Sequence, residues 1–368
     1  MSLKQSAADA PAGGAAGRAG ASRAGAGRRR RRLVGIVVLV SALAVTVIAS
    51  LAIGSRAISP GTVWDAVFYR YSTGPGVANR DLNEAAIIVQ TLRVPRTLLA
   101  VLVGASLAVA GALMQGHTRN PIADPGLLGI TQGAAFAVVV TVYLGRLDHP
   151  LQYVWFAFLG AAIAAVVVFG LSSVGSGVAS PLTLVLAGTG VSIFLSAMTS
   201  AVALSDQQTL DALRFWNAGA VSGRGYDVIV ATAPFLILGL LLAFANGPAI
   251  NLLNLGDDVA KGLGLNVGLA RGFGIVAVTL LAGAGTAACG SIAFLGLMAP
   301  HVARFITGPD HRWLLPYSAL IGAVLLLTAD IIGRVVARPG ELEVGIVLAL
   351  VGAPFFVVLV WWRKAAKL

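Results

Sequence analysis

The chain of 368 residues is 57% hydrophobic and only 11% charged. A soluble domain carries about a quarter charged residues, so this composition excludes a water-soluble protein. It predicts an all-α membrane protein, because lipid offers no partner to an unpaired backbone group. Of the net charge of +11, +7 lies in residues 1–32, where eight basic residues face Asp9 alone. A charge concentrated in one tail does not favour a nucleic-acid partner, and we expect none.

Residues 1–32 are otherwise rich in Ala, Gly and Ser. We therefore expect a disordered basic tail in the cytoplasm, followed by one transmembrane domain over residues 33–368. The run from Arg28 to Arg32 directly precedes an apolar segment, where it would contact anionic membrane lipid and keep the N-terminus inside. That segment, 33–53, is longer than the core of a signal peptide, so we expect it to be retained.

Apolar windows of about 20 residues predict ten membrane helices. They lie at 33–54, 92–114, 127–145, 152–172, 182–204, 227–246, 271–289, 292–306, 313–333 and 344–362. The eighth is short and contains Pro300, so a half-helix is the alternative there. With ten spans, the loops on the side of the N-terminus contain mainly basic groups such as Arg119, Lys261 and Arg312, whereas the opposite loops contain mixed charge. This places both termini in the cytoplasm.

An internal repeat links two of these spans. Residues 102–111 and 281–290 share the pattern Leu-x-Gly-Ala-x-x-Ala-x-x-Gly. The two helices would run in opposite directions, so helices 2–5 and 7–10 are candidates for inverted repeats, as in several transporters. The alternative is chance recurrence of small residues in a Gly- and Ala-rich membrane protein.

The sequence contains no motif for catalysis or for binding a nucleotide. None of its four lysines is followed by Ser or Thr, as a P-loop requires, and it has no His-Glu-x-x-His or Gly-x-Ser-x-Gly. Cys289 is the only cysteine, and the four histidines lie scattered at positions that we expect to be loops. We therefore expect no enzyme activity, cofactor or metal site.

One acidic residue, Asp330, lies within a predicted span. An ion pair with Arg334, one helical turn later, is the simpler interpretation, and a proton relay is the alternative. With so few carboxylates in the membrane, an ion-driven carrier is disfavoured. Energy for any transport must then come from another source.

The loop at 247–270 is the best candidate for receiving that energy. Asp257 and Asp258 suit the start of a short helix, where carboxylates meet the positive end of the helix dipole. Gly262 and Gly264 would end it. A short helix beneath a membrane domain is suited to contact a partner subunit, although such a loop can also be a simple connector.

Three sets of residues make the chain similar to a known family. They are Arg93-Val-Pro-Arg96-Thr with Asn120-Pro-Ile-Ala-Asp-Pro-Gly-Leu-Leu-Gly129; Leu255-Gly-Asp-Asp-Val-Ala-Lys-Gly-Leu-Gly-Leu265; and Phe294-Leu-Gly-Leu-Met-Ala-Pro-His301-Val-Ala-Arg304 with Gly352-Ala-Pro-Phe-Phe356. Over about residues 50–365 the chain resembles the FecCD-type permeases of bacterial ABC importers for ferric siderophores, haem and cobalamin. The domain at 33–368 is then the permease domain.

The resemblance implies the partners of the chain. They are two ATP-binding-cassette ATPase subunits, a substrate-binding lipoprotein or periplasmic protein, and a second permease copy or homologue. The cargo would be a ferric siderophore crossing the cytoplasmic membrane, with haem or cobalamin as alternatives. A secondary carrier and a membrane scaffold are less favoured classes.

The resemblance also implies roles for individual residues. Outer-face arginines that bind acidic residues of the binding protein correspond to Arg93, Arg96 and Arg334, which we expect to be exposed. The element that faces the ATPase corresponds to residues Leu255, Gly256, Asp257, Asp258, Lys261, Gly262, Leu263 and Gly264. The cytoplasmic gate corresponds to Asn120 and Ile122. Glu343 departs from the family, which has proline there, and leaves the geometry of that outer loop open.

Overall fold

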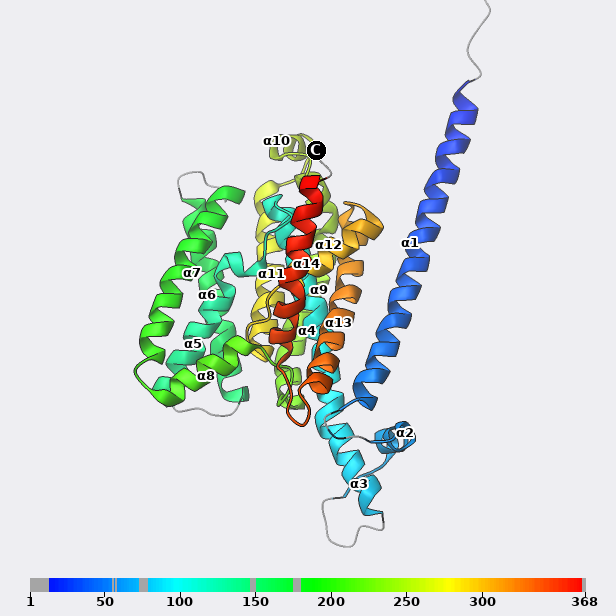
Figure 1. Ribbon diagram of the computed structural model, residues 1–368. Coiled ribbons are helices and arrows are strands. Elements are labelled where there is room, and N and C mark those ends of the chain that lie inside the picture. The colour runs from blue at the N-terminus through cyan, green and yellow to red at the C-terminus, as the bar shows by residue number, and fades with distance from the viewer. Residues whose placement is uncertain are drawn as a thin grey trace, which may run out of the picture.

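The computed structural model describes residues 13–54, 56, 58–72, 79–145, 150–174 and 180–365. Over these residues the chain forms fourteen α-helices, one π-helical turn (η1) and one 3-10 turn (η2), and no strand (Figure 1). In chain order they are α1 (Gly13–Ala52), α2 (Pro60–Phe68), α3 (Arg80–Ile87), η1 (Ile88–Arg93), α4 (Val94–Thr118), η2 (Pro125–Leu128), α5 (Ile130–Gly145), α6 (Pro150–Ser173), α7 (Pro181–Ala203), α8 (Gln207–Ala218), α9 (Tyr226–Leu253), α10 (Asp257–Gly262), α11 (Val267–Cys289), α12 (Leu295–Thr307), α13 (His311–Val336) and α14 (Val344–Ala365).

Each of the ten predicted spans corresponds to one helix, namely α1, α4, α5, α6, α7, α9, α11, α12, α13 and α14. Within the described ranges, 7 helices are long and apolar enough to cross a membrane, and α5 and α14 contain shorter apolar segments. The prediction of an all-α membrane protein with about ten membrane helices is confirmed. α12 has 13 residues, or about 20 Å of helix, so it is a half-helix reached through the non-helical segment 290–294.

Successive membrane helices run in opposite directions (Figure 1). The start of the described part of α1, the end of α14 and the short helix α10 lie at one end of the bundle, which we call the α10 end. The helices α2, α3 and α8 lie at the other end, which we call the α8 end. The sequence did not predict these three, because they are too short and too polar to register as spans.

The packing of glycines agrees with the inverted repeat. In α4, a Cβ added to Gly104 would lie 2.7 Å from the carbonyl oxygen of Gly322 in α13. The equivalent Gly283 in α11 faces α6 through Phe158 and Ala161. α4, the first helix of one repeat, thus packs a glycine against α13, the third helix of the other repeat. α11, the first helix of the second repeat, packs its equivalent glycine against α6, the third helix of the first, as two inverted repeats would.

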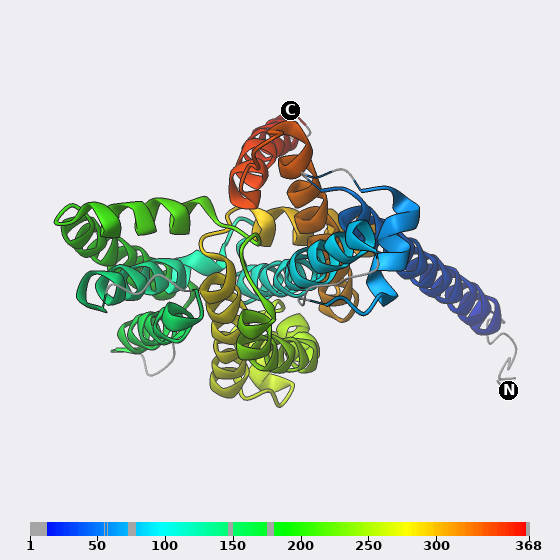
Figure 2. The ribbon, with the colours of Figure 1, turned by 90° about the horizontal axis from the view of Figure 1, so that it is seen from below.

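α1 lies on the opposite side of the bundle from α5–α8 (Figure 2). It packs on α13 through Gly35, where an added Cβ would collide with Tyr317. Arg32 donates to the carbonyl oxygen of Thr307 at 2.7 Å and lies over the ring of Trp313. Residues 13–32, which we predicted to be disordered, continue α1, because Ala and Arg are strong helix formers. The rest of the predicted tail lies outside the described residues.

The histidines differ from the sequence prediction, which placed them in loops. His117, His301 and His311 lie in helices and are buried, while His149 lies outside the described residues. Gly274 leaves the space that the His117 ring fills, and Asn246 Nδ2 lies 3.3 Å from its Nε2. These rings therefore pack inside the α10 half of the bundle.

Candidate functional site

The helix α10 is a short helix of six residues that lies between two glycines with positive φ. Gly256 precedes it with φ +111°, and Gly264 follows it with φ +85°. Asp257 and Asp258 occupy its first turn, as predicted. Gly262 is its last residue, and the chain turns away at Gly264, whose N–H donates to the carbonyl of Lys261 at 2.9 Å, so both glycines lie at the end of the helix as predicted.

Asp257 connects α10 to the membrane helices. Its carboxylate pairs with Arg119, the residue that follows α4. It also accepts two hydrogen bonds from Arg271 of α11, at 2.8 and 3.0 Å. Arg271 is only 6% exposed, so the carboxylate is held at a fixed position. Displacement of α10 would therefore pull on α4 and α11 together.

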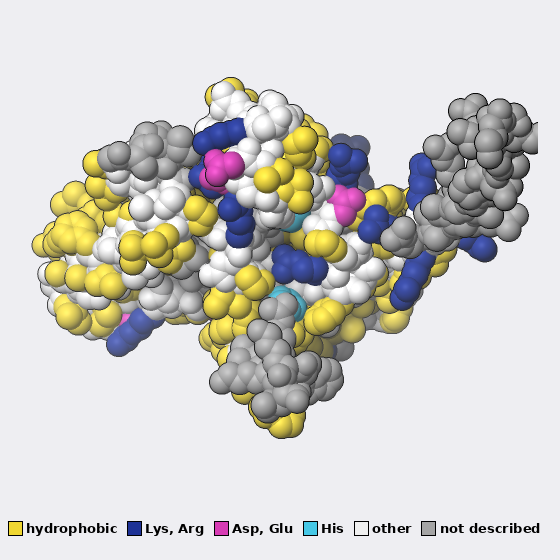
Figure 3. All heavy atoms as spheres, turned by 90° about the horizontal axis from the view of Figure 1, so that it is seen from above, with side chains coloured by type: hydrophobic (Ala, Val, Ile, Leu, Met, Phe, Trp, Pro, Cys, Tyr) yellow, Lys and Arg dark blue, Asp and Glu magenta, His cyan; other side chains and the backbone are white. Residues whose placement is uncertain are grey.

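The outer surface of α10 and its flanks is apolar. Leu255 and Leu263, which flank α10, are 60% exposed, and Val259 within the helix is 50% exposed. Lys261 is exposed beside them. Lys and Arg side chains outnumber acidic ones across this end of the molecule (Figure 3). Three exposed apolar residues on a polar end face are typical of a protein interface.

The residues predicted to form a gate lie at the same end. Asn120 follows Arg119, which adopts a left-handed conformation and ends α4. The Oδ1 atom of Asn120 accepts from the backbone N–H of Ile122 at 3.1 Å, and the Ile122 side chain is 58% exposed. The turn therefore projects an apolar side chain at the α10 end, directly beside the contact between Arg119 and Asp257.

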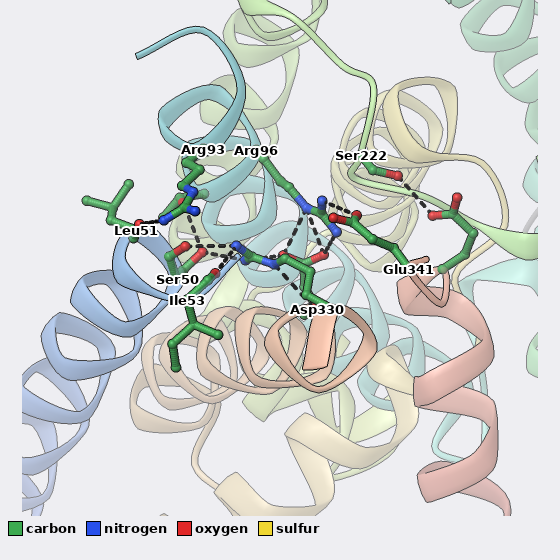
Figure 4. Close-up of polar contacts among 11 residues, drawn as sticks. Ser50, Leu51, Ile53, Arg93, Arg96, Ser222, Asp330 and Glu341 are labelled. Carbon is green, nitrogen blue, oxygen red and sulfur yellow. Dashed lines mark hydrogen bonds and ion pairs between the residues drawn. The ribbon is translucent and has the colours of Figure 1, made fainter. Parts of the chain in front are cut away.

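Of the three arginines predicted to be exposed at the α8 end, Arg93 and Arg334 are buried instead, and Arg96 is only partly accessible. Arg93 is 5% exposed and Arg334 2%. Both donate to backbone carbonyls where α1 ends, at distances of 2.7 to 2.9 Å: Arg334 to Ser50 and Ile53, and Arg93 to Leu51 and Ala52 (Figure 4). The last carbonyls of a helix lack partners within it, and cations stabilise that end of the dipole. The two arginines therefore cap α1.

Arg96 links this buried cluster to the surface. It donates to Asp330 at 2.6 Å and to Glu341 at 2.5 Å, and its side chain is 12% exposed (Figure 4). Asp330 also pairs with Arg334 at 2.5 Å and is 1% exposed. The predicted pair of Asp330 and Arg334 is confirmed. Glu341, at 28% exposure, is the most accessible group of the cluster.

Glu343, the departure from the family pattern, has a structural role. It directly precedes α14, and its side chain accepts from Ser222 Oγ at 3.0 Å. Ser222 belongs to the loop between α8 and α9. The acidic residue therefore ties this loop to the loop before α14, beside the Arg96 cluster (Figure 4).

No group of three or more His, Cys, Asp or Glu side chains suited to a metal ion occurs in the described part of the chain. The two ends of the bundle thus carry different kinds of site. The α10 end has an apolar contact face held by an ion-paired carboxylate. The α8 end has a buried cluster of ion pairs with one accessible acidic group.

Comparison with known proteins assigns this chain to a family. The FecCD transport family matches residues 42–362. The chain belongs to this family. Among FecCD relatives, the ferric enterobactin transport system permease protein FepD of Escherichia coli K12 is 41% identical over 330 residues, covering 89% of this chain and 95% of FepD. The probable siderophore transport system permease protein YfiZ of Bacillus subtilis 168 is 40% identical over 333 residues, covering 90% and 96%.

A solved structure agrees with the family assignment. A metal-chelate type ABC transporter in an inward-facing conformation superposes with a TM-score of 0.76 at 28% identity, covering 89% of this chain and 98% of that one. This FecCD chain is therefore an integral membrane protein and the permease component of an ABC transporter.

The sequence did not predict several residues of the sites at the α10 end and the α8 end. Val259 was detectable, since it is an apolar residue within the short helix that the sequence predicted. Arg119, Arg271 and Glu341 were not, because each gains its partner only through folding. Arg119 and Asp257 are 138 residues apart, and Arg96 and Glu341 are 245 apart.

Proposed function

We propose that this permease imports a ferric siderophore, driven by two ATPase subunits that dock on α10. The observation that carries the proposal is the apolar face of Leu255, Val259 and Leu263, together with the ion pairs of Asp257. The face supplies a contact area, and Asp257 transmits its movement to α4 and α11. The N- and C-termini would then lie in the cytoplasm, at the α10 end.

The remaining partners follow from the same orientation. A substrate-binding protein would dock at the α8 end, where acidic side chains of that protein would compete with Glu341 for Arg96. A second copy of the permease or a homologue would complete the pathway. At the α10 end, the turn at Asn120 and Ile122 would serve as the gate, because its position beside Arg119 couples it to α10.

The cargo is inferred from the relatives. Permeases named for enterobactin and for hydroxamate share about 40% of their residues with this chain, which favours a ferric siderophore. A hemin permease of Yersinia pestis is 35% identical and keeps haem as the second candidate. Uptake of labelled ferric siderophore, haem and cobalamin by cells expressing the complete transporter distinguishes them. Uptake of haem or cobalamin without siderophore uptake would contradict the cargo assignment.

Docking on α10 is tested by copurification. Leu255→Ser combined with Leu263→Ser should abolish copurification of the ATPase subunits while leaving the permease folded, because both side chains project outward. Leu204→Ser is the matched control, since Leu204 is 76% exposed but follows α7 at the α8 end. Equal recovery of ATPase with the double variant and with wild type would contradict the proposal.

A further inference from the structure

The short helix α2 presents two large aromatic side chains that the proposed function does not use. Trp64 is 69% exposed and Phe68 is 74% exposed. They lie one helical turn apart, so both are on one face of the helix. Their rings meet edge to face, with centroids 5.4 Å apart. Two adjoining aromatic rings left open on one helix face are typical of an interaction surface.

Another face of α2 holds the helix firmly in the protein. Val63 and Ala66 are buried among apolar residues of α3 and η1. Gln90 Nε2 in η1 donates to the carbonyls of Ala66 and Tyr69 at 2.7 Å, which satisfies acceptors where α2 ends. At its start, Ser59 Oγ accepts from a backbone N–H of the first turn at 3.2 Å. The aromatic face therefore has a fixed direction.

The aromatic face of α2 is turned away from the bundle. η1 continues directly into α4, which is buried among the other membrane helices. α2 lies at the periphery, beside the end of α1 (Figures 1 and 2). Because the buried side chains of α2 pack on α3 and η1, the face that carries Trp64 and Phe68 points outward from the bundle.

α2 lies at the level where the membrane segment of α1 ends. The apolar run of α1 stops at Ile53. Leu51, in the last turn of α1, packs with Ile58 on the same apolar cluster as α2. Arg93 of η1 donates to the carbonyls of Leu51 and Arg56 at 2.7 Å. A span of about 20 apolar residues ends where the hydrocarbon layer ends, so these contacts place α2 at the membrane boundary.

The surroundings of α2 favour lipid over a protein partner. The neighbouring α1 faces outward along most of its membrane segment, through side chains such as Val45 and Ile48, and α2 continues this peripheral surface. Exposed aromatic residues mark the same level on other helices, at the α8 ends of α5, α6 and α9: Tyr143, Trp155 and Tyr226. Trp and Tyr gather where membrane meets water.

We propose that α2 is a membrane anchor whose Trp64 and Phe68 side chains insert into the bilayer at the α8 end, at the boundary between lipid headgroups and acyl chains. An indole ring suits this boundary, because its body is apolar and its N–H can donate to lipid oxygens. Asp65, the one charged residue of α2, is exposed and stays in the aqueous layer. The proposal rests neither on the ATPase contact nor on the cargo.

Nitroxide labels on single cysteines test this placement in the assembled transporter in liposomes. Oxygen concentrates in lipid and a charged nickel chelate stays in water, so collisions with each report the surroundings of a label. Trp64→Cys and Phe68→Cys each retain the other aromatic ring, and the native Cys289 is buried. We expect both labels to collide mainly with oxygen. Asp65→Cys, on the same helix, is the matched control and should collide mainly with the nickel chelate.

The competing occupant is the substrate-binding protein proposed to dock at this end. Adding that protein should leave the labels at positions 64 and 68 unchanged. Equal collision with the nickel chelate at positions 64, 65 and 68 would overturn the proposal. Protection of positions 64 and 68 that arises only with the binding protein would overturn it as well. The two aromatic positions are tested separately, so if one variant does not fold, as judged by its melting temperature, the other decides the result.

Discussion

Asp330 sits between two guanidinium groups at a depth where charge is expensive. Its carboxylate is 1% exposed and lies 2.6 Å from Arg96 and 2.5 Å from Arg334. Arg334 in turn holds the end of α1 through backbone carbonyls. The carboxylate therefore stabilises the positive charges that join α1, α4 and α13. Its role in the described structure is structural pairing, as the sequence favoured over a proton relay.

Replacing Asp330 with Asn should destabilise the protein strongly. Removing one partner from a buried ion pair leaves an uncompensated charge, at a cost of about 3–5 kcal/mol. A lower melting temperature of the purified permease measures the effect. Asp211→Asn is the control, because its pair with Arg214 is exposed and should contribute less than about 1 kcal/mol. Similar melting temperatures for the two variants would contradict this role.

Glu341 is the group that a docking partner must displace if Arg96 binds the substrate-binding protein. Glu341→Gln removes the competing charge and should raise the affinity of the binding protein for the permease, most clearly at low salt. Surface plasmon resonance on nanodisc-embedded permease measures this. Arg96→Glu should have the opposite effect. Weaker docking with Glu341→Gln would show that the partner uses Glu341 itself.

At the scale of elements, α10 depends on backbone conformations that only glycine adopts easily. Gly264 has φ +85° and an added side chain would meet no neighbouring atom. Gly262 also has open space around it but lies within the helix. The two glycines therefore differ in backbone conformation and not in crowding, which makes them a matched pair.

Gly264→Ala should strain the end of α10 by about 1–2 kcal/mol and reduce ATP-dependent uptake. Gly262→Ala should leave uptake unchanged and favour the helix slightly, since Ala is preferred over Gly in a helix by about 0.5–1 kcal/mol. Uptake and ATPase activity in proteoliposomes measure both variants. Equal loss in the two variants would show that the surface of α10, and not its backbone, determines coupling.

The ten membrane helices were predictable because each contains a run of mostly apolar residues, a signal that is local in sequence. α2, α3 and α8 were not, because each is too short to register as an apolar membrane span. The limits of α10 were predicted from its aspartates and glycines. The burial of Arg93 and Arg334 was not, because their partners are the carbonyls of a helix 41 to 284 residues away.

At the scale of the whole molecule, α7 presents two different faces. One borders a groove of about 480 Å³ whose lining includes Gln132 and three serines, beside two apolar residues: Ser192, Ser196, Ser200, Ile193 and Ala197. The other borders an apolar groove of about 450 Å³ between α5, α6 and α7, which Phe194 helps to line. Hydroxyl groups on the outside of a membrane helix are costly against lipid. The serine face is therefore suited to a water-filled pathway between two permease subunits.

This assignment predicts which positions of α7 contact water. The native Cys289 is buried, so an introduced cysteine is the accessible thiol. In the assembled transporter, Ser196→Cys should react with a membrane-impermeant charged thiol reagent, and its rate should change between nucleotide-free and ATP-bound states as the pathway opens and closes. Phe194→Cys, on the apolar side of the same helix, should react slowly in both states because a thiolate forms poorly in lipid. Fast, state-independent reaction at both positions would show that α7 lies at a static aqueous surface rather than along an alternating pathway.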